Sequence, residues 1–319
     1  MDGNDPLWQQ ERSRFAPSDA EDAAVIRYRD WNLLRYWFRG VERFAPWVRT
    51  IHLVTWGSVP SWLNTAHPKL RIVTHESYLP KTACPTFNSN AIELSMHRIA
   101  DLAEQFVYFN DDMFLLRPVE PTFFFRDGLP CDNAVLSPVM PVWGDTISKT
   151  ILNNMFLINK HFDCRRVMRQ HWGKWLRLQY GSGLLRTLCL LPWRHFPGFF
   201  NDHLPVAYRK QTFEQLWQAE GPVLQEVTHH RFRCYSGDVN HWLMRYWQLC
   251  QGRFCPVGNR GKDLHIEAEE TLQAIRAQRY AMICINDSNT IGLEFEQVRG
   301  KVAAAFESVL RLPCLYEKD

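Results

Sequence analysis

The chain has 319 residues, of which 46% are hydrophobic and 22% are charged, and its formal net charge is +3. This is the composition of an ordinary globular protein with one large domain or two modest ones, and so small a charge does not indicate nucleic acid as a partner. No run of about 18 apolar residues occurs, so we expect no transmembrane helix, and the polar, acidic start is not that of a signal peptide. The nine cysteines include no C-x-x-C pair, which is typical of reduced thiols in a cytosolic protein.

The first 119 residues alternate between helical and strand patterns. In chain order, the expected elements are a polar loop at 9–24, a helix at 30–45, strands at 50–57 and 70–75, a helix within 85–106 and a strand at 106–109. Asp30 is placed to cap the first helix, and Asn90 with Glu93 three residues later matches a capping box in the second. This alternation predicts an α/β fold with an open, mostly parallel sheet of the Rossmann or GT-A type.

The rest of the chain is mostly helical. The expected elements are a hairpin at 123–138, helices within 147–192 and at 212–219 and 237–251, a strand at 280–287 and a C-terminal helix at 294–311. We therefore expect one domain over 1–319, in which 1–119 and about 280–319 form the α/β core, while about 120–279 form a hairpin and a largely helical insertion.

Residues 164–193 combine a basic and an apolar pattern. The segment places five basic side chains beside tryptophans and a leucine: Arg165, Arg166, Arg169, Lys174 and Arg177 beside Trp172, Trp175 and Leu176. A basic amphipathic helix can lie on an anionic membrane surface. The alternative is an ordinary packed helix with a solvated face, and the sequence leaves both interpretations open.

Carboxylates follow expected strands at several places. Asp111 and Asp112 come directly after the strand at 106–109, Asp287 ends the late strand, and Asp2 and Asp5 stand where a first strand would have ended. Ligands of open α/β sheets bind beyond the carboxyl ends of strands, and a buried carboxylate is costly unless it is paired or binds a metal. Any one of these aspartates could be a cap or turn residue, but their recurrence predicts a Mg²⁺ or Mn²⁺ site rather than a zinc site.

Candidate bases and cations occur in two later stretches. His203 lies in a non-periodic, proline-flanked stretch, and histidine has a pKa suited to general-base work near neutral pH. Arg231 and Arg233 precede an expected helix, and arginine side chains bind phosphate oxygens through two parallel hydrogen bonds. Each of these signals is weak without further support, because a lone histidine is more often structural than catalytic.

Four stretches resemble, in order, the conserved blocks of the Stealth family, which comprises hexose-1-phosphoryl transferases of capsule and exopolysaccharide synthesis. They are "MDGNDPLW" at 1–8, the long second block at 27–75 and 85–119, the third block at 202–210 and 228–247, and "CINDS" at 284–288. The resemblance covers nearly the whole chain apart from 120–195, which makes it far more specific than a short motif.

The resemblance implies a role for individual residues. It makes His203 the general base and Arg233 the phosphate-binding arginine, with Arg231 as the nearest competitor. The catalytic set is His203, Arg233, Asp112 and Asp5, the substrate-binding set is Arg27, Asn90, Glu93 and Arg231, and the metal-binding set is Asp5, Asp111, Asp112 and Asp287.

The resemblance also implies the reaction. An acceptor hydroxyl, deprotonated by His203, attacks the phosphorus next to the sugar of a UDP-sugar, UMP leaves, and sugar-1-phosphate is joined to a glycan or lipid-linked acceptor with Mg²⁺ or Mn²⁺ as cofactor. The cysteine usage places this chemistry in the cytoplasm, and the basic pattern at 164–193 leaves a peripheral contact with the inner membrane as one of the two interpretations given above. As in phosphoryl transfer generally, catalysis would consist mainly of positioning and charge stabilisation.

Two other functions are compatible with the sequence, and the sequence departs from the Stealth family pattern at two places. Asn-Asp-Asp at 110–112 also resembles the D-x-D motif of glycosyltransferases, which release UDP, and the 13 tryptophans are compatible with a carbohydrate-binding module. Family members carry a strand before the first block, whereas this sequence begins at Met1, so we expect that the natural reading frame starts upstream or that 1–8 hang loosely. Ser77 stands where many members have an acidic residue.

Overall fold

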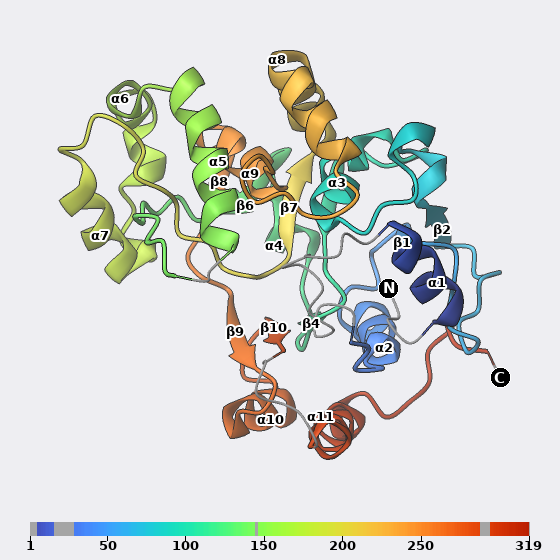
Figure 1. The fold of residues 1–319 in the computed structure, drawn as a ribbon. Coiled ribbons are helices and arrows are strands. Elements are labelled where there is room, and N and C mark those ends of the chain that lie inside the picture. The colour runs from blue at the N-terminus through green and yellow to red at the C-terminus, as the bar shows by residue number, and fades with distance from the viewer. Residues whose placement is uncertain (1–4, 16–28, 144–145, 288–293, 319) are drawn as a thin grey trace.

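The computed structural model describes residues 5–15, 29–143, 146–287 and 294–318 (Figure 1). The helices are α1 (Pro6–Phe15), α2 (Leu34–Phe44), α3 (Ser89–Leu94), α4 (Pro121–Phe124), α5 (Ile147–His161), α6 (Cys164–Trp175), α7 (Ser182–Leu190), α8 (Lys210–His229), α9 (Trp242–Cys250), α10 (Glu269–Arg276) and α11 (Phe295–Val309). The strands are β1 (Ile51–Thr55), β2 (Leu70–Thr74), β3 (Gln105–Tyr108), β4 (Met113–Leu115), β5 (Phe125–Arg126), β6 (Leu129–Asp132), β7 (Val206–Arg209), β8 (Cys255–Pro256), β9 (Gly261–His265) and β10 (Met282–Asn286).

The α/β class predicted from the sequence is confirmed, but the strands pair differently from the prediction. The described strands form four small sheets, in the orders β1-β2, β3-β7, β5-β6-β8 and β4-β10-β9. Among these, only the β1–β2 sheet is wholly parallel, since β3 runs antiparallel to β7, β5 to β6 and β4 to β10, whereas β6–β8 and β9–β10 are parallel pairs. The single open, mostly parallel sheet that the alternation predicted is therefore not apparent in the described part of the chain.

Two antiparallel pairs gather several loops at one edge. Tyr108 at the carboxyl end of β3 pairs with Val206 at the amino end of β7. Met113 at the start of β4 pairs with Cys284, and the backbone N–H of Ile285 donates to the carbonyl of Asp112 at 2.9 Å. The turn after β3, the loop before β7 and the end of β10 therefore lie together, although they come from three distant parts of the sequence.

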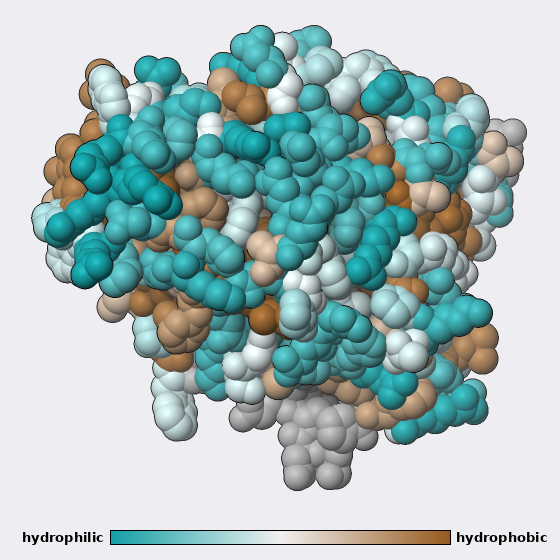
Figure 2. Space-filling view, turned by 90° about the horizontal axis from the view of Figure 1, so that it is seen from above, coloured by the Kyte–Doolittle hydropathy of each residue, from teal (hydrophilic) through white to brown (hydrophobic). Residues whose placement is uncertain are grey.

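The basic and apolar segment folds on the side of the molecule that α5, α6 and α7 occupy, at the left of Figure 1. The buried face of α6 presents Val167, Met168 and Trp175 to the larger hydrophobic core. Seen from above, hydrophobic and strongly hydrophilic residues lie next to each other along this left edge (Figure 2). No helix in the described residues is both long and apolar enough to cross a bilayer.

Several element predictions are confirmed: β1, β2, β3 and β10, helices α2, α5–α9 and α11, and the β5–β6 hairpin all occur where the patterns placed them. The loop expected at 9–24 is wrong in its first part, because α1 extends to Phe15. Trp8 is buried against Phe87, so residues 5–8 pack on the fold rather than hang loosely, whereas Asp2 lies outside the described residues. The division of the chain into an α/β core and an insertion stays a prediction.

Both predicted helix caps are wrong. The N-cap of α2 is Leu33, and the carboxylate of Asp30 instead accepts from the backbone N–H of Asn32. The N-cap of α3 is Asn88, whose side chain accepts from the backbone N–H of Asn90. Asn90 is the second residue of α3 and not its N-cap. Its spacing to Glu93 therefore does not make a capping box.

Candidate active site

A cavity of about 1710 Å³ opens at the edge where these loops meet. The predicted site residues that line it are Asp5, Asn90, Glu93, Asp111, Asp112, His203, Arg233 and Asp287. Ligand pockets usually measure about 300–1,000 Å³, so this cavity has room for a nucleotide sugar together with part of an acceptor.

Asp112 occupies the tight turn between β3 and β4. Its side chain is 32% exposed, but its Oδ1 atom is buried and has no hydrogen-bond partner among the described residues. Burial raises the pKa of this carboxyl to about 6, against the lowering effect of His203 and with a further rise from Asp111. A buried, unsatisfied carboxylate oxygen is costly, and a cation would satisfy it.

His203 lies in the loop before β7, with both ring nitrogens in contact with side chains. Nδ1 lies 2.9 Å from Oδ1 of Asn286, 3.2 Å from Sγ of Cys284 and 4.0 Å from Oδ2 of Asp112. Nε2 lies 3.2 Å from Nδ2 of Asn110. The imidazole is 32% exposed to the cavity, so a substrate hydroxyl can reach it.

The two asparagines determine which nitrogen of His203 carries the proton. Asn110 Oδ1 accepts from the hydroxyl of Tyr108, which directs its Nδ2–H toward His203 Nε2. Asn286 Nδ2 donates to Asp263, which directs its Oδ1 toward His203 Nδ1. Neutral imidazole has one donor and one acceptor nitrogen, so this network assigns the hydrogen to Nδ1 and the lone pair to Nε2.

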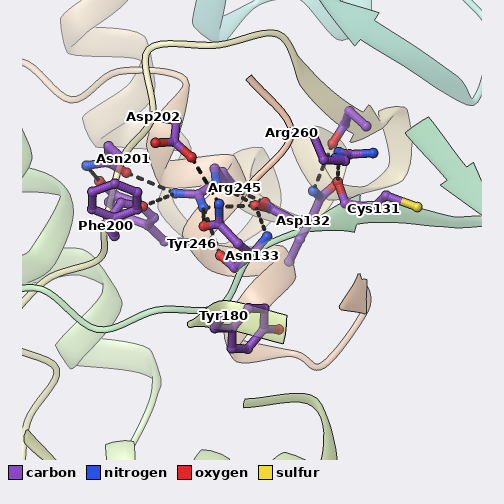
Figure 3. A network of polar contacts seen from close by, with 12 residues as sticks. Cys131, Asp132, Asn133, Tyr180, Phe200, Asn201, Asp202, Arg245, Tyr246 and Arg260 are labelled. Atoms are coloured by element: carbon purple, nitrogen blue, oxygen red, sulfur yellow. Dashed lines mark hydrogen bonds and ion pairs between the residues drawn. The ribbon is translucent and has the colours of Figure 1, made fainter. Parts of the chain in front are cut away.

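A buried ion pair holds the chain just before His203 (Figure 3). Both Nε and Nη2 of Arg245 donate to the carboxylate of Asp132, at 2.9 and 2.8 Å. Nη1 donates to the carbonyl of Phe200 and to Oδ1 of Asn201, each at 3.0 Å. Because Asn133 also donates to Asp202 at 3.0 Å, three consecutive residues before His203 are anchored, and Arg245 acts as a positioning residue.

The structure distinguishes the two candidate arginines. Arg233 lines the cavity and donates from Nη2 to the hydroxyl of Ser89 at 2.8 Å. Arg231 is not among the residues that line this cavity; it donates to the carbonyl of Pro85 and lies over the ring of Phe15. The geometry therefore favours Arg233 for contact with phosphate.

Two predicted substrate-binding residues are engaged inside the protein. Asn90 Nδ2 donates at 3.1 Å to the fully buried carboxylate of Asp238, which also accepts from the backbone N–H of Cys234. Asn90 thereby supports the segment that carries Arg233. Glu93 is buried, and it shares the single hydrogen of the Tyr108 hydroxyl with Oδ1 of Asn110. Arg27, the third member of the set, lies outside the described residues.

The outer carboxylates of the predicted metal set have protein partners. Asp5 accepts from the backbone N–H groups of Leu7 and Trp8 at the start of α1. Asp287 accepts from Trp31 Nε1 at 3.0 Å and from Arg29 at 3.5 Å. Asp111 is exposed in the turn. Their role as metal ligands stays a prediction, and Asp112 has the strongest structural case.

The ligand atoms near Asp112 indicate which metal ion would fit the site. Asp112, His203 and Cys284 offer ligand atoms within 4.8 Å of one another. Burial raises the pKa of the Cys284 thiol far above its usual range, and a protonated thiol is a poor metal ligand. Mg²⁺ and Mn²⁺ bind through one or two carboxylates together with substrate phosphates, so the unsatisfied Oδ1 of Asp112 and the neighbouring Asp111 suit such an ion.

Sequence reasoning missed the residues that surround His203. Asn110 belongs to the Asn-Asp-Asp stretch at 110–112 and Asn286 to the CINDS stretch at 284–288. Their place at strand ends was the sequence signal that could have identified them. Tyr108 and Cys284 carry no such signal, because buried strand positions accept many side chains. Arg245 and Asp132, which are 113 positions apart, could not have been paired from one sequence.

The cavity combines a histidine, carboxylates suited to a divalent ion and an arginine, a set of side chains that fits a group-transfer site. Residues 27–131 match the family described as Stealth protein CR2, conserved region 2. The chain is 39% identical over 314 residues to capsular polysaccharide phosphotransferase WcwK of Streptococcus pneumoniae, covering 98% of this chain and 92% of that one.

Two further relatives extend over nearly the full length. Exopolysaccharide phosphotransferase cps2G of Lactiplantibacillus plantarum is 39% identical, with 100% of this chain and 94% of the relative covered. Receptor polysaccharide phosphotransferase WefC of Streptococcus oralis is 36% identical, with 97% and 95% covered. The chain belongs to the Stealth family, and the family and the phosphotransferase class predicted from the sequence are both confirmed.

Glu93 makes stability depend on pH. Burial raises its pKa from 4.5 to about 7, against the lowering effects of Tyr108 and Arg233. Below pH 4.5 the carboxyl is protonated in both states; above it only the unfolded chain releases the proton, so stability falls until about pH 7 and is constant beyond. The shift corresponds to about 3 kcal/mol.

Glu93→Gln should remove this dependence, because glutamine does not ionise and its oxygen can still accept from Tyr108. In urea unfolding, the variant should match the parent near pH 4.5 and exceed it by up to about 3 kcal/mol at pH 8. Glu104→Gln, at an exposed ion pair with Arg209, is the matched control and should show no such divergence. Parallel curves for parent and Glu93→Gln would contradict the prediction.

Proposed function

We propose that this protein transfers sugar-1-phosphate from a UDP-sugar to a hydroxyl of a glycan or lipid-linked glycan, with release of UMP, in capsular or exopolysaccharide synthesis. The observation that carries the proposal is the place of His203, whose Nε2 lone pair is held by Asn110 and whose Nδ1 lies 4.0 Å from Asp112, on a cavity that Arg233 also lines. The proposed location is the cytoplasm, at the periphery of the inner membrane.

His203 is the proposed general base. An acceptor hydroxyl that reaches Nε2 replaces the amide of Asn110 there and gives up its proton as its oxygen attacks the phosphorus next to the sugar. The bond between that phosphorus and the bridging oxygen breaks, and the oxygen leaves with UMP. The imidazolium that forms keeps its Nδ1–H directed at Asn286 Oδ1, with Oδ2 of Asp112 4.0 Å away, and this negative charge stabilises it.

Arg233 and the aspartates supply the charge stabilisation that phosphoryl transfer requires. The guanidinium of Arg233 is held by Ser89 at the cavity wall, where it can donate two parallel hydrogen bonds to phosphate oxygens. Asp112, with Asp111, would hold Mg²⁺ or Mn²⁺, which when bound neutralises phosphate charge. The wall of the cavity orients the donor so that attack is in line with the departing UMP.

The leaving group tests the reaction class. The purified protein, a UDP-sugar, a glycan acceptor and Mg²⁺ or Mn²⁺ should yield UMP and a product that retains the sugar phosphate, seen by chromatography and ³¹P NMR. Release of UDP, with the sugar joined through its anomeric carbon and no phosphate in the product, would make the protein a glycosyltransferase and overturn the proposal.

Asp112→Asn tests the metal-binding carboxylate. The change keeps the shape and removes the charge, so the concentration of Mn²⁺ that gives half-maximal activity should rise at least about tenfold, as seen when metal-site interactions are lost. The fold should persist, because Oδ1 makes no hydrogen bond to any described residue. Asp287→Asn is the matched comparison and should shift the requirement less. Unchanged metal dependence together with a loss of several kcal/mol in stability would make Asp112 a structural residue.

A further inference from the structure

The segment from Cys164 to Asn201, here called the basic lobe, contains α6, the 3-10 helix η5 (Leu178–Tyr180) and α7. Seven of the chain's 37 basic residues lie in it, and none of the 34 acidic residues. The lobe therefore has a formal charge of +7, while the remaining 30 basic and 34 acidic residues give the rest of the chain −4. The small overall charge hides a strongly uneven distribution.

The positive charges of the lobe are turned toward solvent. Six of the seven basic residues are exposed: Arg165, Arg166, Arg169, Arg177, Arg186 and Arg194. None of them forms an ion pair with a carboxylate of the described residues. Their hydrogen bonds go to uncharged groups, such as that from Arg165 to the carbonyl of Pro192 at 3.1 Å and that from Arg186 to the hydroxyl of Ser137. The first of these contacts brings α6 beside the end of α7.

Large apolar side chains are exposed among these arginines. Within 22 positions the exposed fractions are 65% for Trp172, 89% for Leu178, 65% for Leu185, 43% for Leu188 and 55% for Trp193. Single exposed apolar residues need no explanation, but a contiguous set marks an interaction surface. On α6, Arg165, Arg166 and Arg169 are exposed while Val167 and Met168 are buried, and Figure 2 shows hydrophobic and hydrophilic residues adjacent on this side.

We propose that the basic lobe docks on the surface of an anionic lipid membrane. Arginines pair with lipid phosphates, while tryptophan and leucine enter the boundary between headgroups and acyl chains. A second copy of the chain using the same face would bring like charges together, and the phosphate backbone of a nucleic acid gives no partner to exposed leucines. The proposal concerns where the protein sits, and it does not depend on the proposed reaction.

Flotation of the full-length protein with vesicles tests the proposal. The protein should float with vesicles of phosphatidylglycerol and phosphatidylcholine, remain behind with phosphatidylcholine alone, and dissociate in high salt. Each arginine at an anionic surface contributes about fivefold to binding, so Arg165→Gln with Arg169→Gln should weaken it about 25-fold. The control pair Arg276→Gln and Lys301→Gln, exposed on α10 and α11, should change it little.

A second pair separates insertion from charge alone. Trp172→Ser with Trp193→Ser should weaken binding to the anionic vesicles while leaving the fold intact, because both side chains are exposed. The proposal is overturned if the parent protein does not bind anionic vesicles, or if the control pair weakens binding as much as the Arg165→Gln and Arg169→Gln pair. It is also overturned if the lobe variants instead abolish a dimer seen by light scattering. Turnover with a soluble acceptor should be unaffected by all of these changes, so a failed assay for UMP release would leave the flotation result standing.

Discussion

His203→Ala should lower kcat by about 10²–10⁴-fold, the usual cost of removing a general base. Its neighbours Asn110, Asn286 and the protonated thiol of Cys284 are not bases. The carboxylate of Asp112 lies beside Nδ1, 4.0 Å away, and not at Nε2, where the acceptor hydroxyl would arrive. KM for the donor should change little, because Arg233 and the cavity wall still bind the phosphates. Single-turnover kinetics with a UDP-sugar would separate the chemical step from binding.

Controls distinguish catalysis from stability. His203 contacts Asn110, Asn286 and Cys284 through its ring nitrogens, and such hydrogen bonds contribute about 1 kcal/mol each, so the variant should fold and unfold cooperatively. His229→Ala removes an exposed histidine that bonds Thr82 and the carbonyl of Gln225, and it should retain full turnover. Added imidazole should restore part of the activity of His203→Ala by entering the vacated space. Near-normal kcat in a folded His203→Ala protein would place the base elsewhere.

The convergence of the site could be predicted because it follows a general rule. Asp111, Asp112 and Asp287 come directly after strands, and residues at strand ends meet at sheet edges. That reasoning, which assumed a parallel sheet, predicted that these aspartates lie together, and in the structure they line one cavity, which His203 also lines. The antiparallel β3–β7 and β4–β10 pairs bring these loops together, while the role of the aspartates as metal ligands stays a prediction.

The errors have a common physical origin in contacts between distant parts of the chain. Asn90 and Glu93 have the spacing of a capping box, but the nearby Asn88 takes the cap, and their side chains bond Asp238 and Tyr108. Local patterns record which residue types suit a helix start; they do not record competing partners from other segments. Strand pairing has the same limit, since periodicity identifies β3 and cannot show that it lies beside β7.

Arg245→Met should lower the free energy of unfolding by about 3–5 kcal/mol, because it leaves the carboxylate of Asp132 charged and buried without its partner. The guanidinium uses its donors on Asp132, Asn133, Phe200 and Asn201. Methionine fills a similar volume and supplies none of them. The carbonyl of Phe200, which is part of the anchored stretch before His203, would also lose a donor.

An exposed ion pair provides the matched control. Arg209 lies 3.3 Å from Glu104 at the surface, and such pairs contribute about 0–1 kcal/mol, so Arg209→Met should be mild in urea unfolding. Adding Asp132→Leu to Arg245→Met should recover part of the lost stability, because it removes the unpaired charge.

The same variants test whether Arg245 positions the base. In the double variant, stability should be partly regained while kcat stays low, because Phe200 and Asn201 still lack the donor that Arg245 supplied and the imidazole of His203 is no longer held in one orientation. A purely structural Arg245 would instead give kcat that recovers in proportion to the folded fraction. Equal losses in the free energy of unfolding for Arg245→Met and Arg209→Met would contradict this role. Full recovery of kcat in the double variant would show that the buried ion pair does not control the position of His203.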